Sequence, residues 1–180
     1  AGAMTTAPTQ LLRLAALTLA AVAISVSANA GIKSPRLLAK IAQLTPAPVI
    51  VEKGSEMQLA EQQAAKVGGQ ALWGIGSSME PLYAPGTAVV VTPMNYDDIK
   101  KGMTVVYRKA NGRYVAHSVI GEDGKGYIVQ GVNNDEPDEI SVNEKNMVGV
   151  ITAAYSANEA TFHRMIAAAG QTNAKTVAMR

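Results

Sequence analysis

From Gly69 onward, short apolar runs rich in β-branched residues alternate with turn-forming residues. The runs are TAVVVTPM, MTVVYRKANGRYVAHSVIG, GYIVQGVNN and MVGVITAAYS. β-Branched residues are favoured in strands, and glycine, proline and asparagine mark the turns between them. The pattern predicts a mainly β domain over residues 70–156, folded as a strongly bent antiparallel sheet.

The segment KANGR at residues 109–113 predicts a β-hairpin, because Asn-Gly between two apolar runs is a strong hairpin signal. The hairpin would pair the strand at 105–108 with the strand at 114–119 in antiparallel register. Side chains alternate across a strand, so the second strand has two distinct faces. One face carries Val115, His117 and Val119, and the other carries Tyr114, Ala116 and Ser118.

The segment at 31–69 has a different pattern, with a short helix in SPRLLAKIAQL, an extended linker in TPAPVIVE and a second helix in SEMQLAEQQAAKVGGQ. Gly68 and Gly69 are expected to close the second helix. The tail at 157–180 is expected to be partly helical from Asn158. Helices are therefore predicted only in the amino-terminal third and in the tail.

Residues 1–30 have the pattern of a targeting segment. We interpret residues 1–3, which precede Met4, as a remnant of cloning. An apolar run at Leu14–Val26 then leads to Ala28-Asn29-Ala30, the small-residue pattern of a signal-peptide cleavage site. The sequence predicts export to the periplasm or medium, with cleavage before Gly31. The alternative is an uncleaved amino-terminal anchor that holds the protein at the membrane.

Composition excludes several classes of function. The chain has 180 residues, 48% of them hydrophobic, which is enough for one domain with a core. Its 16 basic and 14 acidic residues are scattered, so no nucleic-acid partner is expected. The absence of cysteine excludes disulfides and thiolate chemistry, and with two histidines neither a metal site nor a cofactor is expected.

The stretch WGIGSSMEP, residues 73–81, places a loop with little side-chain bulk directly before an apolar strand. Such a loop exposes a hydroxyl and lets another chain approach its backbone, although most Gly-Ser stretches are ordinary surface turns. Trp73 either lines a groove beside this loop or packs in the core. Three motifs then follow one another along the chain: Ser-Met-Glu-Pro at 78–81, a histidine on the hairpin, and Gly-Val-Asn-Asn at 131–134.

In this order, the motifs resemble those of type I signal peptidases, most closely the Ser-His branch of archaea and the endoplasmic reticulum. The resemblance covers about Trp73 to Ile151 and implies a domain of signal-peptidase type. It implies Ser78 as the nucleophile and His117 as the general base. The acidic residues that support the base in this family correspond to Asp138 or Asp135, and the spacing after the asparagine pair favours Asp138.

The resemblance also assigns substrate contacts and oxyanion stabilisation to Gly76, Ser77 and Met79. The chain departs from the family at several places. Gly76 stands where the family tends to have a serine that donates to the oxyanion, and Ser118 stands where an arginine usually follows the base. Thr87, Met103 and Val132 stand where the family usually has aspartate.

Ser-His chemistry has a plain physical basis. A serine hydroxyl is a weak nucleophile, and a neutral imidazole within hydrogen-bond reach can accept its proton and pass it to the leaving amine. The sequence therefore predicts a serine endopeptidase that processes exported polypeptides bound as an added β-strand. Two alternatives stay open: a weak or inactive peptide-binding module of the same fold, and a dedicated peptidase of conjugation-type or self-cleaving kind.

Overall fold

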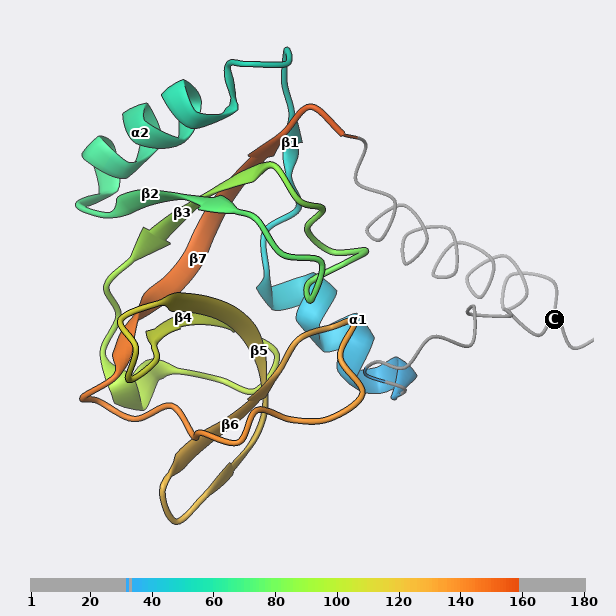
Figure 1. Ribbon diagram of the computed structural model, residues 1–180, viewed down its shortest axis with the longest axis vertical. Coiled ribbons are helices and arrows are strands. Elements are labelled where there is room, and N and C mark those ends of the chain that lie inside the picture. Colours follow the sequence, from blue (N-terminus) through green and yellow to red (C-terminus); the bar gives the residue numbers. More distant parts are fainter. Residues whose placement is uncertain (1–31, 33, 159–180) are drawn as a thin grey trace, which may run out of the picture.

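In the computed structural model, which describes residue 32 and residues 34–158, seven strands form one bent sheet (Figure 1). Their order is β2-β3-β7-β4-β5-β6, and β1 pairs with β7 off this path. The β1–β7 pair is parallel, and the other pairs are antiparallel. The predicted mainly β class is confirmed. The strands are β1 (Val49–Ile50), β2 (Gln70–Gly74), β3 (Thr87–Thr92), β4 (Thr104–Arg108), β5 (Tyr114–Asp123), β6 (Gly126–Gln130) and β7 (Met147–Ser156).

Shifts of register accompany the bend of the sheet. They fall at Val90/Val91 between β3 and β7, at Val106/Tyr107 between β4 and β7, and at Val119/Gly121 between β5 and β6. Such irregularities bend a strand and increase its twist. Apolar side chains are buried on both faces of this bent sheet. The α1 face packs Val89, Val91, Val106 and Ile151, and the opposite face packs Val105, Tyr107, Val119, Val129 and Val142.

Helix α1 (Pro35–Leu44) covers one of these faces. The residues at its two ends favour a helix that begins and ends at these positions. The Ser34 hydroxyl accepts a hydrogen bond from the Leu37 N–H, and Pro35 stands at the start of the helix, where proline is favoured. Ile41 is wholly buried in the core beneath the helix. The helix ends at Thr45, directly before a proline, which disfavours helical backbone in the residue that precedes it.

Helix α2 (Glu56–Val67) packs on β2 and β3 (Figure 1). Ala60 and Ala64 are buried against Ala88 and Val90, and these small side chains let the helix approach the sheet closely. Gly68 ends the helix in the left-handed conformation, with φ of 67°. Both predicted helices, and the closure of the second by glycine, are confirmed.

Two details differ from the prediction. Residues 49–50 of the expected linker form β1 and pair with Tyr155 and Ser156 of β7, so the segment at 31–69 joins the β domain instead of leading to it. A short 3-10 helix at Tyr96–Asp98 also lies outside the two regions where helices were expected. Its tyrosine ring packs against the ring of Tyr127, with centroids 4.7 Å apart, which holds this turn against β6.

The predictions for residues 1–30, and for nearly all of the tail at 157–180, lie outside the described residues. They include the signal peptide or anchor and the helix of the tail. Within residues 32 and 34–158, no helix is long and apolar enough to cross a membrane.

Candidate active site

The hairpin of β4 and β5 positions His117. Its turn has the Asn-Gly form predicted, with the Lys109 N–H bonded to the Arg113 carbonyl at 2.9 Å and Gly112 at φ of 83°. The register places His117 opposite Val105, so its ring lies on the face of the sheet that packs Val105 and Val119. The His117 residue is 5% exposed. The imidazole is therefore held in one orientation by strand pairing and burial.

Ser78 lies in the turn after β2, and the loop after β6 holds that turn in place. The Asn133 N–H donates to the Ser78 carbonyl at 2.8 Å, and the Asn133 side-chain amide donates to the Ser77 carbonyl at 3.3 Å. A Cβ at Gly131 would stand 2.7 Å from the Ser78 carbonyl oxygen, so this approach requires glycine. Met79 is buried in the core directly after the serine and anchors the turn.

The two loops and the hairpin bring three side chains into one hydrogen-bonded chain. The Ser78 Oγ lies 3.0 Å from the His117 Nε2, and the His117 Nδ1 lies 2.7 Å from the Asp138 Oδ2. A carboxylate only accepts hydrogen bonds, so Nδ1 carries the proton and Nε2 accepts from the serine hydroxyl. Ser78 and His117 are 39 positions apart along the chain. The arrangement has the geometry of a Ser-His-Asp triad.

Asp138, and not Asp135, is the acid beside the base. The Asp138 N–H donates to the Val129 carbonyl at 2.8 Å, which fixes this part of the loop at the end of β6. Burial raises the pKa of Asp138, but hydrogen bonds from His117 and Tyr107, together with the charges of His117 and Lys109, lower it by more, so the pKa lies below its ordinary value. Asp135 is exposed and makes no hydrogen bond to His117 within the described chain, so of the two predicted aspartates the structure places only Asp138 beside the imidazole.

Tyr107 is a fourth member of this network, and the sequence did not reveal it. Its hydroxyl donates to the same Asp138 Oδ2 that accepts from His117. Burial, followed by the hydrogen bond and the charge of Asp138, raises the pKa of Tyr107 well above its ordinary value, so the phenol stays protonated and donates. Strand alternation offered one signal, since Tyr107 shares a face with Val105, the cross-strand partner of His117.

Replacing Tyr107 with phenylalanine is expected to lower kcat about tenfold with little change in KM, because the carboxylate loses one of its two anchoring donors. Tyr83→Phe is the matched control, since it removes a buried hydroxyl that binds the Pro46 carbonyl elsewhere. Steady-state kinetics of both variants, with thermal melting beside them, make the comparison. Equal loss of kcat in the two variants would contradict a positioning role for Tyr107.

The turn offers one backbone donor to a developing oxyanion. Within the described chain, the Ser78 N–H donates no hydrogen bond, so it is free to donate to a substrate carbonyl oxygen. Gly76 and Ser77 are both exposed beside it. Gly76 has no side chain to add a second donor, and the oxyanion contacts assigned to Ser77 and Met79 stay a prediction.

Gly76→Ser is expected to raise kcat by up to about a hundredfold, because a hydroxyl at this position would supply a second oxyanion donor. A Cβ at Gly76 meets nothing within 4 Å, so the serine fits without displacing a neighbour. Gly76→Ala adds the same Cβ without the hydroxyl and should bring no gain. A rise in kcat of equal size in both variants, measured on one peptide, would contradict the donor role.

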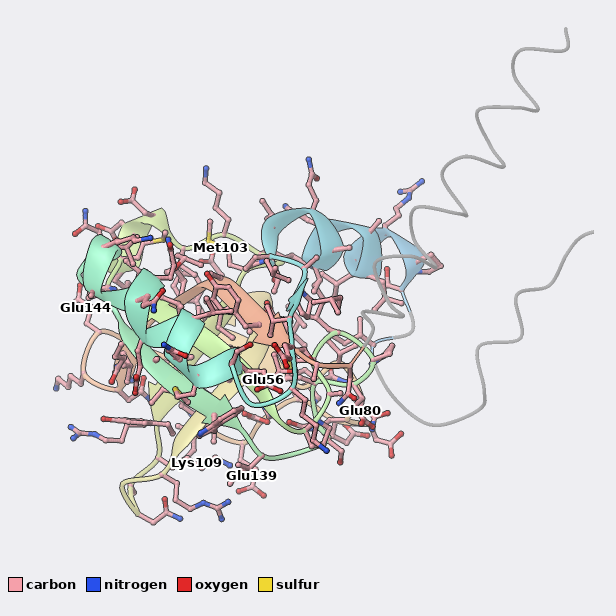
Figure 2. The ribbon with its side chains drawn as sticks, turned by 90° about the horizontal axis from the view of Figure 1, so that it is seen from above. Glu56, Glu80, Met103, Lys109, Glu139 and Glu144 are labelled. Carbon is pink, nitrogen blue, oxygen red and sulfur yellow. The ribbon has the colours of Figure 1, made fainter. Side chains whose placement is uncertain are left out.

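The surroundings of the network are polar on the side of Asp138. Lys109 and Glu139 line an open hollow beside that aspartate, and Figure 2 shows both on the same side of the molecule. Lys125 is exposed in the turn between β5 and β6 and has no part in the network. Among the described residues, no cluster of three or more metal-ligating side chains could hold a metal ion.

The chain matches no known family model, and a search of curated proteins also gives no match. The resemblance to signal peptidases accordingly stays a prediction. It depends on the motifs around Ser78, His117 and Asp138, and these are the residues that the fold brings together.

Proposed function

We propose that this protein is a serine endopeptidase of signal-peptidase type that processes exported polypeptides. The observation that carries the proposal is the hydrogen-bonded chain from the Ser78 hydroxyl through His117 to Asp138. Burying a histidine between a serine and a carboxylate costs free energy, and such arrangements are typical of functional sites. This order of groups suits acyl transfer. The apolar run and the Ala28-Asn29-Ala30 pattern support a location outside the cytoplasm.

The proposed reaction has two halves. The Ser78 Oγ attacks the scissile carbonyl carbon while the His117 Nε2 takes its proton, and the imidazolium then gives that proton to the leaving amine. Water, deprotonated by the same nitrogen, hydrolyses the acyl-serine and restores the hydroxyl. Asp138 accepts from Nδ1 throughout, which keeps the tautomer and stabilises the imidazolium, and the Ser78 N–H faces the oxyanion.

The edge of the sheet supports binding of an extended peptide. Within the described chain β2 pairs only with β3, so its outer edge has unpaired backbone groups directly before the Ser78 turn. Trp73 is 48% exposed and Ile75 is 81% exposed on this stretch. A substrate strand could add to this edge, with the two apolar side chains beside it and small residues next to the scissile bond.

The proposal is tested with an extended synthetic peptide that has alanine at the first and third positions before the scissile bond. Mass spectrometry of the products should identify a single cut after the alanine at the first position. Binding of the intact peptide without cleavage, by correctly folded protein, would favour the inactive peptide-binding module instead. This alternative has weight because Gly76 stands where the resembled family tends to have a serine that donates to the oxyanion.

Cleavage is expected to decline at acidic pH, because a histidine base must be neutral to accept a proton from the serine hydroxyl. Initial rates on the same peptide between pH 5 and pH 8 measure this. A lysine base would instead place the decline at a higher pH. A rate that does not change across the range would contradict a histidine base.

A further inference from the structure

A row of buried polar side chains crosses the α1 face of the sheet, which otherwise packs apolar residues. Thr104, Ser118 and Gln130 are cross-strand neighbours on β4, β5 and β6, and all three are buried. The Thr104 and Ser118 hydroxyls lie 3.2 Å apart and bond to each other. Gln130 instead donates from its Nε2 to the Asn134 carbonyl at 2.7 Å. The end of the row is therefore bonded to the loop after β6.

The residues next to this bond hold the nucleophile. Asn134 closes a tight turn, because its N–H donates to the Gly131 carbonyl at 3.0 Å. Within that turn, Asn133 donates its N–H to the Ser78 carbonyl at 2.8 Å, and its side-chain amide donates to the carbonyl one residue earlier at 3.3 Å. Gln130 thus binds the residue that directly follows the clamp on the nucleophile.

The acid of the network is held separately from this turn. The Asp138 N–H donates to the Val129 carbonyl, and the Asp138 carboxylate accepts from His117 and Tyr107. None of these bonds involves a residue of the turn at 131–134. A change in the Gln130 side chain should therefore displace the nucleophile and leave the base and its acid in place.

We propose that Gln130 is a positioning residue, which keeps the Ser78 hydroxyl within reach of His117 by holding the turn at 131–134. This inference rests on the proposed function. The amide belongs to a buried strand, so its bond to the Asn134 carbonyl joins the loop to the rigid sheet. Precise placement matters because a displacement of about 1 Å in an active site can lower a rate about a hundredfold.

Two variants remove the bond in different ways. Gln130→Met keeps the length of the side chain but has no donor, and Gln130→Asn keeps the amide but is one methylene too short to reach the Asn134 carbonyl. Each should lower kcat for the synthetic peptide about tenfold with KM unchanged, because the nucleophile is displaced while the peptide still binds along β2. Fluorophosphonate labelling of Ser78 should slow by the same factor.

Tyr127→Phe is the matched control on the same strand. It removes a side-chain hydrogen bond, at 3.0 Å, from β6 to the Tyr96 carbonyl, and it should keep kcat. Thermal melting of all three variants separates a loss of stability from a loss of position. An equal loss of kcat in Tyr127→Phe and Gln130→Met would overturn the role of Gln130.

The pH profile distinguishes an effect on the nucleophile from an effect on the base. Because Gln130 acts on the side of Ser78, the decline of kcat at acidic pH should fall at the same pH in Gln130→Met as in the unchanged protein. A shift of this decline would show that the variant disturbs His117 or Asp138. That result would overturn the proposed route.

Asn133→Ala tests whether Gln130 acts through the turn. This variant removes the side-chain clamp on the Ser77 carbonyl and should lower kcat severalfold by itself. Since both residues act through one turn, the loss in the double variant with Gln130→Met should be smaller than the product of the two single losses. Losses that multiply fully would show independent effects and overturn the route through the turn.

The outcomes separate this inference from the proposed function. A protein that cuts the peptide equally well with Gln130→Met or Gln130→Asn overturns the role of Gln130 alone. If Ser78 labels but the peptide is not cut, the endopeptidase proposal fails. Slower labelling in both variants then supports positioning by Gln130, and unchanged labelling overturns it. A protein that neither cuts the peptide nor labels on Ser78 overturns both proposals.

Discussion

Ser78→Ala and His117→Ala are each expected to lower kcat for peptide cleavage by roughly 10⁵- to 10⁶-fold, because nucleophile and base act as one unit. The 3.0 Å contact between Ser78 Oγ and His117 Nε2 is the physical reason for equal losses. The double variant should therefore lose little more than either single variant. Turnover of the synthetic peptide, followed by mass spectrometry over hours, measures all three.

The neighbouring serine provides the control for this prediction. Ser77→Ala removes an exposed hydroxyl one position away, and it should cost far less than Ser78→Ala. Full activity in Ser78→Ala would eliminate the peptidase proposal. An enzyme that depends on Ser78 but keeps its rate in His117→Ala would retain the nucleophile and require another base.

Asp138→Asn is expected to lower kcat by about 10⁴-fold while the fold stays intact. The amide can donate to Nδ1, which places the imidazole proton on Nε2, the nitrogen that must accept from Ser78. Asp135→Asn is the matched control, because this carboxylate is exposed on the same loop. Kinetics and circular dichroism of both variants test the assignment, and equal losses of kcat would contradict it.

The same carboxylate affects stability in a direction fixed by its lowered pKa. An aspartate with a lowered pKa stabilises the folded state above its ordinary pKa of about 3.9, and this contribution is lost as the pH falls through the lowered value. At neutral pH, the unchanged protein should therefore have a larger free energy of unfolding than the Asp138→Asn variant. The difference should shrink below about pH 4, as denaturant titrations can measure.

Local sequence predicted much of the fold because its signals act over short distances. The Asn111-Gly112 turn determines which strands pair as β4 and β5, and thereby the face on which His117 lies. Gly68 similarly marks the end of α2. The strand β1 escaped prediction because two residues after a proline have no periodicity of their own, and their pairing depends on β7.

The candidate site was predicted in part, from motif order. The meeting of Ser78 and His117 followed from the resemblance, and the spacing after the asparagine pair favoured Asp138. The contact itself joins Asp138 to His117, 21 positions away, and depends on the path of the loop after β6. Tyr107 stands in an apolar strand, where an aromatic residue is ordinary core. Only the path of the loop after β6 brings a carboxylate to its hydroxyl.

The most direct measurement is covalent labelling of the folded protein with a fluorophosphonate at neutral pH, followed by peptide mapping. An activated serine reacts with such a probe, whereas an ordinary surface hydroxyl does not. The account predicts one adduct, on Ser78, which disappears in Ser78→Ala and is strongly reduced in His117→Ala. A folded protein that carries no adduct on Ser78, or labels equally well without His117, would contradict it.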